Sequence, residues 1–360
     1  MGNLICIWMI GLVFMGNLTA ENLLHSSVNN HSCFCENVTI TDEVILFSGN
    51  SNRLLAQQVA NYLKIPLGDA LVGKFNDGEI QISIDNSVRN KDVFILQSNC
   101  PSQTQSINDN LMELYLLVRT MKRASAASIT AVIPYYGYAR QDRKVAGRVP
   151  ISAADVALML EVAGVDRVVT VDLHCGQIQG FFHDVPVDNL YAAFMFISYF
   201  ASKDLQNVVV VAPDAGGVER AKKFMENLTK QGIPAEMALI SKQRAKAGVI
   251  QSMNLIGDVA EADVIIVDDL CDTGGTLVKA AELLKEQGAN RVFVAVTHPV
   301  FSGNALEKIR DSMIDEMVIT DTIPLRGEVP DNIHLISVGP LLGEAIRRIQ
   351  SGESLSNLFQ

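Results

Sequence analysis

The chain has 360 residues, of which 48% are hydrophobic and 19% are charged, and its formal net charge is −11. This composition is typical of a globular protein with enough apolar material for two domains. The negative charge argues against a nucleic-acid partner, because no large basic stripe offsets it. The six cysteines show no metal-ligand spacing, so we expect a reduced, cytoplasmic protein.

Residues 1–42 are set apart from the rest as a leader of uncertain role. Residues 1–20 carry no charge, and the apolar run Leu4–Met15 has the length of a signal-peptide core rather than of a membrane span. No Lys or Arg precedes this run. An equal alternative is therefore that Met1 is an upstream start codon that is rarely or never used. A functional leader would direct the protein to an organelle or the secretory route, but the folded body is not expected to meet a membrane.

From Val44 onward, strand-like runs alternate with helical patterns, which is typical of a parallel α/β architecture. Because Asp92–Gln97 and Asp263–Asp268 are similar strands, we expect two tandem domains, each a mainly parallel sheet flanked by helices. The predicted domains are residues 43–190 and 191–338, and residues 339–360 are expected to form a helix on the first domain. The predicted strands are Val44–Ser48, Val93–Gln97, Ser128–Ile133, Arg167–Val171, Val208–Ala212, Val264–Val267, Arg291–Val296 and Glu316–Thr320.

Two motifs in the first predicted domain combine groups that suit a nucleotide. Lys74–Glu79 lies between two strand-like pieces, and its Asn-Asp-Gly sequence alone predicts a hairpin turn. Tyr135–Lys144 follows a buried strand and joins aromatic side chains, which can stack on a base, to cations for phosphate. Each motif taken alone also fits a polar surface loop. Between them we expect a helix over Asn110–Arg123, with Asn108 or Asp109 as its N-cap.

A histidine and three carboxylates are expected to meet at one edge of the sheets. His174 follows the strand Arg167–Val171, and Asp214 follows Val208–Ala212 in a Pro-Asp-Ala-Gly-Gly turn. Ligands of open α/β sheets bind beyond the carboxyl ends of the strands, so these residues should converge with Asp268 and Asp269. Magnesium prefers oxygen ligands and bridges carboxylates to substrate phosphates. A lone histidine is more often structural, and here it could also contact a phosphate instead of the ion.

Lys242-Gln-Arg244 lies in a polar segment that is expected to be a mobile loop. Such a loop is usually a solvated surface. Phosphoryl transfer, however, needs cations over the developing negative charge, and a closing loop often brings them.

The segment Val264–Thr276 has the features of a sugar-phosphate site. A short β-branched run ends at the acids Asp268 and Asp269, a turn is expected from Leu270 to Gly275, and a helix is expected to begin at Thr276. Glycines in the turn let backbone N–H groups approach an anion, and the helix N-terminus favours a phosphate. The neighbouring carboxylates can accept hydrogen bonds from a diol. A plain strand–turn–helix corner with solvated acids is the alternative.

Together these segments follow the order and spacing of the ribose-phosphate diphosphokinases, the synthetases of phosphoribosyl pyrophosphate, which the chain resembles over roughly residues 43–360. Ile107–Leu114, Arg148–Ser152 and Pro186–Asn189 add to the match. Val264–Thr276 resembles the phosphoribosyl-binding loop of the type I phosphoribosyltransferases. The resemblance implies two stacked phosphoribosyltransferase-like domains and a dimer-based homo-oligomer, often a hexamer, with ATP sites completed across subunits.

The reaction that the resemblance implies supplies nucleotide biosynthesis. ATP and D-ribose 5-phosphate would give AMP and 5-phospho-α-D-ribose 1-diphosphate, by Mg²⁺-dependent in-line attack of the C1 hydroxyl on the β-phosphorus. The same resemblance gives Lys242 and Arg244 to catalysis, and His174 and Asp214 to the metal. The implied ATP-binding residues are Phe75, Asp77, Gly78, Glu79, Arg140 and Gln141, and the implied ribose 5-phosphate-binding residues are Arg244, Asp268, Asp269, Asp272, Thr273, Gly274, Gly275 and Thr276.

The resemblance also implies an effector site for inorganic phosphate, as an activator, or for ADP, near Ser87–Arg89, Ser152 and Ser337–Gly339. The chain departs from the family pattern at Ser241–Ala245, where Ser-Lys-Gln-Arg-Ala replaces the more usual Asp-Lys-Arg-Arg-Pro and removes one cation. Two rival functions remain at this point. One is a catalytically silent regulatory subunit, and the other is a salvage phosphoribosyltransferase, which would lack the ATP-type motifs.

Overall fold

The computed structural model describes residues 40–41, 43–246 and 249–359, and leaves the side chains of residues 242–252 and 359 undescribed. The predicted leader, residues 1–42, lies outside this range except for Ile40 and Thr41. Within the described residues, no helix combines the length and the apolar character needed to cross a membrane.

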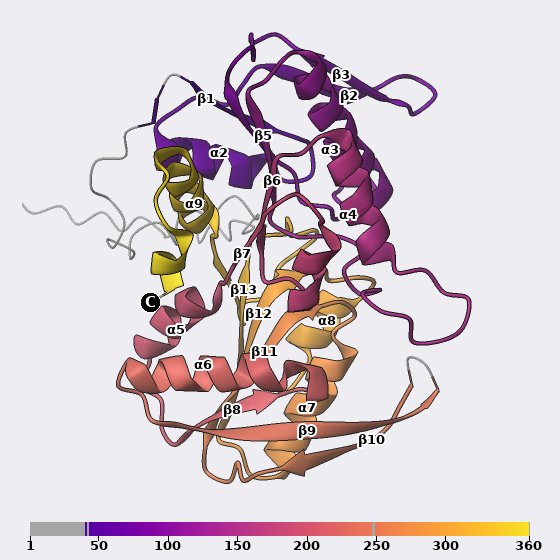
Figure 1. Cartoon of the computed structure of the whole chain (residues 1–360). Helices are drawn as coiled ribbons and strands as arrows, with labels where there is room; N and C mark the ends of the chain where they lie inside the picture. The colour runs from indigo at the N-terminus through magenta and orange to yellow at the C-terminus, as the bar shows by residue number, and fades with distance from the viewer. Residues whose placement is uncertain (1–39, 42, 247–248, 360) are drawn as a thin grey trace, which may run out of the picture.

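Two sheets lie one above the other in Figure 1, joined by helices and loops between them. The first sheet has five strands in the order β1-β4-β5-β6-β7, and all its neighbouring pairs are parallel. The second has seven strands in the order β10-β9-β8-β11-β12-β13-β14, and every pair except β10 with β9 is parallel. The predicted α/β class with two mainly parallel sheets is confirmed.

The strands of the first sheet are β1 (Val44–Ser48), β4 (Asp92–Leu96), β5 (Ser128–Ile133), β6 (Arg167–Val171) and β7 (Val187–Leu190). The strands of the second sheet are β8 (Val208–Ala212), β9 (Ala235–Lys246), β10 (Val249–Ile256), β11 (Asp263–Cys271), β12 (Arg291–Pro299), β13 (Glu316–Thr320) and β14 (Ile333–Ile336). A separate antiparallel hairpin, β2 (Ala70–Lys74) and β3 (Ile80–Ile84), projects from the first half of the molecule (Figure 1).

Helices cover both sheets. Contacts place α3 (Ile107–Arg123) against the first sheet and α4 (Ser152–Ala163) against α3, while α2 (Arg53–Leu63) packs on α9 (Gly339–Ser351). The helix α9, near the C-terminal end of the described residues, therefore lies beside α2, as Figure 1 shows. The second sheet is covered by α5 (Ala193–Ala201) and α6 (Val218–Lys230) on one face, and by α7 (Gly275–Glu286) and α8 (Ala305–Arg310) on the other.

The core explains why the strands are uninterrupted apolar runs. Successive side chains of a strand point to opposite faces, and both faces of these sheets are covered. In β4, Val93 and Ile95 join a cluster with α3 and α4, whereas Phe94 joins a central cluster with α2 and α9. In β11, Ile265 and Val267 join that same central cluster. Because one core is shared by both sheets, it fixes their carboxyl edges relative to each other.

The predictions for the Lys242 segment and for the start of α3 are wrong. The segment with Lys242 and Arg244 is not a loop, because its backbone forms β9 and pairs in antiparallel register with β10. Alternation is hard to see in such a polar sequence, which is why the strand escaped prediction. Helix α3 begins at Ile107, and its N-cap is Ser106, which exchanges hydrogen bonds with Asp109 in a capping box.

Candidate active site

The site is built on β11, which lies between β8 and β12 in the second sheet. Its residues Val264 to Val267 are buried, and the strand continues through Asp268 and Asp269 as far as Cys271. The expected turn from Leu270 is therefore wrong, since the two acids stand inside the strand end. The two side chains differ in exposure: 21% for Asp268 and 5% for Asp269.

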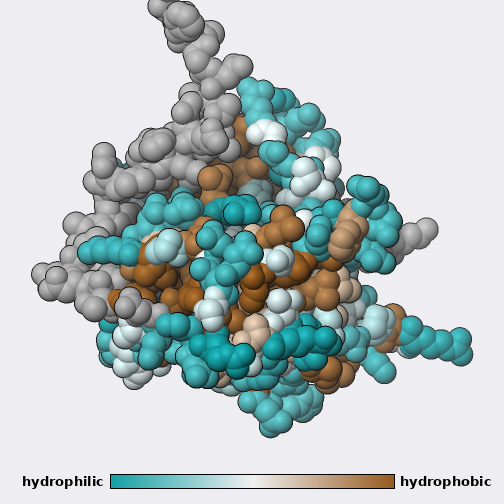
Figure 2. All heavy atoms as spheres, turned by 90° about the horizontal axis from the view of Figure 1, so that it is seen from above, coloured by the Kyte–Doolittle hydropathy of each residue, from teal (hydrophilic) through white to brown (hydrophobic). Residues whose placement is uncertain are grey.

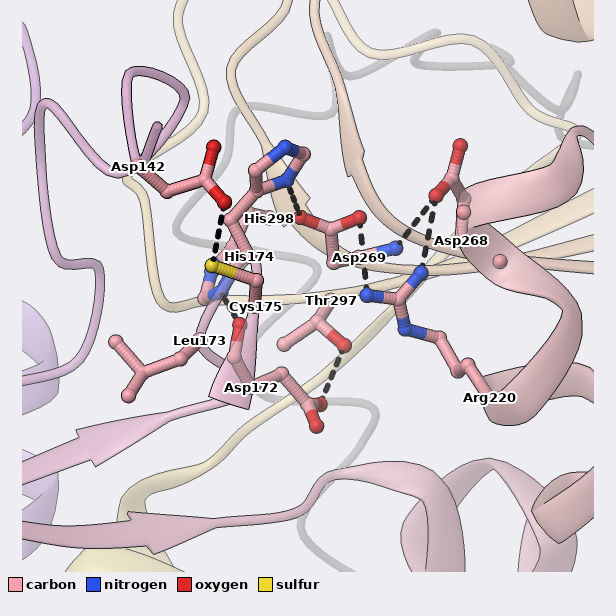
Figure 3. Close-up of polar contacts among 12 residues, drawn as sticks. Asp142, Asp172, Leu173, His174, Cys175, Arg220, Asp268, Asp269, Thr297 and His298 are labelled. Carbon is pink, nitrogen blue, oxygen red and sulfur yellow. Dashed lines mark hydrogen bonds and ion pairs between the residues drawn. The ribbon is translucent and has the colours of Figure 1, made fainter. Parts of the chain in front are cut away.

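Arg220 joins the two acids. It lies in the first turn of α6, and one terminal nitrogen is 3.3 Å from Asp268 Oδ1 while the other is 3.1 Å from Asp269 Oδ1 (Figure 3). Asp172 and Asp214 also act on its guanidinium by charge, so Arg220 is a cation surrounded by carboxylates from three strand ends. Sequence reasoning missed it. The available signal was a single arginine in the first turn of the helix that follows the Asp214 turn.

His174 holds Asp269 from the first sheet. Its Nδ1–H donates to Asp269 Oδ2 at 2.7 Å, and this hydrogen bond raises the pKa of His174 despite partial burial. Burial by itself would raise the pKa of Asp269, but the His174 hydrogen bond and the charge of Arg220 lower it. Burial and the neighbouring charge of Asp269 raise the pKa of Asp268 to about 8. The structure thus brings His174, Asp268 and Asp269 together, as the sequence predicted.

A buried polar seam fixes the turn that carries His174. Asp172 has a left-handed backbone (φ 41°), and its carboxylate accepts from the Thr297 hydroxyl of β12 at 2.7 Å. His298, also on β12, has Nε2 3.0 Å from the Val171 carbonyl and 3.1 Å from the Asp172 carbonyl. Burial lowers the pKa of His298, so its neutral ring donates from Nε2 to these carbonyls. Sequence reasoning missed Thr297 and His298, because β12 was expected to end at Val296.

The glycine-rich corner joins β11 to α7. Gly274 has φ +73°, a backbone conformation that residues other than glycine rarely adopt, and it is the N-cap of α7. The helix begins at Gly275 rather than at the expected Thr276. Since glycine has no side chain to cap them, the N–H groups of the first turn face outward from the helix end, where an anion is favoured. Thr273, the remaining residue of the corner, accepts from Lys308 Nζ through its carbonyl at 3.4 Å.

One ion pair links this corner to the first half of the chain. Arg140 Nη1 lies 2.7 Å from Asp272 Oδ2. The Asp272 carboxylate also receives a hydrogen bond from Ser302, and these contacts keep its pKa below the usual value although burial alone would raise it. Next to Arg140, Gln141 accepts a hydrogen bond from the Ser152 hydroxyl. The basic segment after β5 and the glycine corner after β11 are therefore neighbours.

The other predicted nucleotide residues lie elsewhere on this chain. Phe75, Asp77, Gly78 and Glu79 form the tip of the β2–β3 hairpin, where the Phe75 N–H donates to the Glu79 carbonyl at 2.8 Å. The tip is exposed and points away from the body of the molecule (Figure 1). Lys242 and Arg244 are opposite Met253 and Ile250 in the β9–β10 ladder, and their side chains are outside the described residues.

His174 and Asp214 form a donor set whose chemistry suits magnesium. Asp214 caps the turn after β8 by accepting from the Gly216 and Gly217 N–H groups at 3.0 and 3.2 Å. No three His, Cys, Asp or Glu side chains are grouped as a ready metal cage in the part of the chain that the structure describes. Magnesium, however, is usually held by one or two carboxylates together with substrate phosphates. His174 also has the carboxylate partner on Nδ1 that metal-binding histidines commonly have. The residues fit the ion.

The chain is similar to known proteins over most of its length. The family model for the N-terminal domain of ribose phosphate pyrophosphokinase matches residues 44–164, and that for the phosphoribosyl synthetase-associated domain matches residues 229–360. A ribose-phosphate pyrophosphokinase of Campylobacter jejuni is 52% identical over 87% of this chain and 98% of its own length. One of Buchnera aphidicola is 53% identical over 88% of this chain and 98% of its own. The crystal structure of phosphoribosylpyrophosphate synthetase from Mycobacterium smegmatis superposes with a TM-score of 0.78 and 39% identity, covering 86% of this chain and all of that one.

Proposed function

The chain belongs to the family of ribose-phosphate pyrophosphokinases, and we propose that it transfers the diphosphoryl group of ATP to the C1 hydroxyl of ribose 5-phosphate. The oxygen–phosphorus bond forms between C1–OH and the β-phosphorus, the bond between the α-phosphate and the β-phosphorus breaks, and AMP leaves. The hydroxyl proton is released. The products are AMP and 5-phospho-α-D-ribose 1-diphosphate, a precursor for nucleotide biosynthesis.

One structural observation supports this reaction most directly. The Arg140–Asp272 pair puts a cation of the first half at the edge of the glycine corner of the second. A sugar phosphate on the corner and a triphosphate beside Arg140 would then be neighbours. Positioning two substrates in this way supplies a large part of the acceleration in phosphoryl transfer.

In this proposal the glycine corner Asp272–Thr276 binds the 5-phosphate through backbone N–H groups, and Asp268 and Asp269 accept hydrogen bonds from the pentose hydroxyls. The hairpin tip Phe75–Glu79 contacts ATP together with Arg140 and Gln141. His174 and Asp214 would hold magnesium, which when bound supplies charge neutralisation to the triphosphate. His174 keeps Nδ1 on Asp269, so its other ring nitrogen is the one that faces the substrates.

We assign Lys242 and Arg244 to catalysis, with Arg244 also contacting ribose 5-phosphate. Their strand β9 is an extended antiparallel arm with β10 at the margin of the second sheet (Figure 1). Cations there stabilise the charge that develops on the transferred group. Loss of one strong transition-state donor lowers kcat by about a hundredfold or more, so we expect this of Lys242→Ala. Near-normal kcat in that variant would refute the assignment.

The test of the reaction is a product assay. Protein, Mg-ATP and ribose 5-phosphate are mixed, and AMP and phosphoribosyl pyrophosphate are measured; equal amounts of both are expected. A salvage phosphoribosyltransferase would form neither and would instead consume phosphoribosyl pyrophosphate with a base. A regulatory subunit would bind the substrates without turnover.

The assembly and setting complete the proposal. We propose a cytoplasmic, dimer-based homo-oligomer, often hexameric in this family, with inorganic phosphate as an activator, and with residues 43–190 and 191–338 as its two domains. Figure 2 shows hydrophobic atoms gathered between hydrophilic ones on the end formed by the first sheet. Large apolar side chains exposed in this half support a contact with another subunit: Leu71, Phe75, Met112, Leu158 and Val162. Light scattering in solution would give the mass, and cell fractionation the compartment.

A further inference from the structure

The contact between Arg220 and the acid pair is a fork. Each terminal nitrogen of the guanidinium takes one acid, Nη1 on Asp268 at 3.3 Å and Nη2 on Asp269 at 3.1 Å. A planar guanidinium can span two carboxylates in this way, whereas an ammonium offers a single nitrogen. The fork comes from a rigid support, because α6 is anchored in the core by Ala221 and Phe224.

The hydrogen bonds leave one carboxylate oxygen of the pair open. Asp269 uses Oδ1 for Arg220 and Oδ2 for His174. Asp268 uses Oδ1 for Arg220 and for the Asp269 N–H, at 2.9 Å. Its Oδ2 receives no hydrogen bond from the described residues, and in Figure 3 it points away from Arg220. A carboxyl oxygen without a partner can exchange a hydrogen bond with a substrate hydroxyl.

A second arginine–aspartate pair, at the other end of β11, shows what a purely structural pair looks like. Arg291 binds both carboxylate oxygens of Asp263, at 2.9 Å from Nε and 2.5 Å from Nη2, and the Gln206 N–H adds a third contact. The Asp263 side chain is fully buried. That pair closes the carboxylate to any ligand, whereas the fork of Arg220 leaves the pair partly open.

We propose that Arg220 is a positioning residue for ribose 5-phosphate: its two nitrogens hold Asp268 and Asp269 in the orientation that turns Asp268 Oδ2 to the pentose hydroxyls. The inference rests on the proposed function of the site. Without the fork, only the hydrogen bond between the two carboxyls would hold Asp268 and Asp269 together, and neither acid would keep a fixed orientation towards the sugar. The pentose would then meet acceptors at the wrong spacing, while ATP, which binds through other residues, would be little affected.

The test compares Arg220→Ala, Arg220→Lys and Arg291→Lys with the unchanged full-length protein, by steady-state kinetics and by calorimetric titration with ribose 5-phosphate. A hydrogen bond to a charged group contributes enough that we expect Arg220→Ala to raise KM for ribose 5-phosphate at least about tenfold, with KM for ATP within about twofold. Arg220→Lys keeps the charge but not the fork, so it should fold and still raise the same KM several-fold, and the calorimetric Kd should follow. Arg291→Lys should lower thermal stability and leave both KM values unchanged.

Two results would overturn the inference. One is an Arg220→Lys protein that binds ribose 5-phosphate as tightly as the unchanged protein, which decides the matter even where Arg220→Ala fails to fold. The other is an equal rise of both KM values, which indicates general damage. Where the unchanged protein binds ribose 5-phosphate without making AMP, the proposed reaction fails and the calorimetric comparison still decides the role of Arg220. Absence of ribose 5-phosphate binding by the unchanged protein would overturn both.

Discussion

The strands β4 and β11 are similar in sequence, but the carboxyl end of β4 is closed by internal hydrogen bonds and that of β11 is open to a ligand. Asp92–Gln97 and Asp263–Asp268 correspond residue by residue, and the first ends in Gln97 where the second ends in Asp268. Gln97 accepts from the Ser51 N–H at 3.0 Å and donates to Glu113 at 2.9 Å. An amide both donates and accepts, so it can be satisfied inside the protein, whereas a carboxylate only accepts and keeps capacity for hydroxyl donors.

A second buried residue closes the end of β4 in the same way. Glu113, fully buried in α3, also accepts from the Asn50 N–H at 3.1 Å and from the Asn50 side chain at 2.9 Å. The second edge has instead a glycine corner and an acid pair with one open oxygen. Internal hydrogen bonds satisfy Gln97 and Glu113 beside the end of β4, whereas Asp268 keeps an open oxygen at the end of β11. Changes at the two edges should therefore differ in kind.

The largest effect is expected from Gly274→Val. A β-branched residue at φ +73° is strained, so the corner must rearrange. Its N–H groups would then no longer point towards the bound phosphate. We expect kcat/KM for ribose 5-phosphate to fall by about a thousandfold, as when a strong anion-binding donor is lost. Gly232→Val is the matched control, since Gly232 has φ +85° in open space after α6. Equal losses of kcat/KM in both variants would contradict the phosphate role.

Next in size is Glu113→Ala, which should act on stability alone. It removes one acceptor from the buried Gln97 amide and one each from the Asn50 backbone N–H and side-chain amide, so we expect the free energy of unfolding to fall by about 4 kcal/mol. Glu113→Gln keeps one accepting oxygen and should lose less. Urea unfolding measures the stability, and the kinetic assay should give an unchanged KM for ribose 5-phosphate. A raised KM with normal stability would show that the first edge also binds a ligand.

The smallest effect concerns Asp321, which follows β13 where the two edges meet. Burial raises the pKa of Asp321 to about 6, and its backbone carbonyl accepts from Asn52 at the start of α2. Between about pH 4 and 6 the folded protein therefore holds a proton that the unfolded chain releases, and the stability from this group is lost as the pH rises through 6.

Asp321→Asn should remove that loss. The rise of the pKa from the ordinary 3.8 to about 6 corresponds to a loss of at most about 3 kcal/mol in the free energy of unfolding. The variant should therefore be more stable than the unchanged protein at pH 8 and equally stable near pH 4. Thermal unfolding across this range measures the difference. A difference that does not change with pH would show that the Asp321 carboxyl is not the titrating group.

Much of the second edge was determined by the sequence. Buried parallel strands are continuous apolar runs, so Val208–Ala212 and Val264–Val267 were identifiable, and a pair of glycines after an acid-tipped strand predicted the corner. These signals are local, because each depends on a few adjacent residues. Where local signals compete they failed, as at the α3 N-cap, where Ser106 rather than Asn108 or Asp109 takes the position.

The tertiary structure alone decided what surrounds the acids. Arg220 contacts Asp268, which lies 48 residues later in the sequence, and the neighbouring Asp269. His298 donates to the carbonyl of Asp172, which lies 126 residues earlier. No spacing rule encodes such pairs, because they form only when the shared core holds the two sheet edges together. The β9–β10 arm is similar: its polar sequence has no strand pattern, and pairing along the margin of the second sheet makes it a strand. The sequence thus specified the chemical groups, and the packing of two sheets on one core specified their partners.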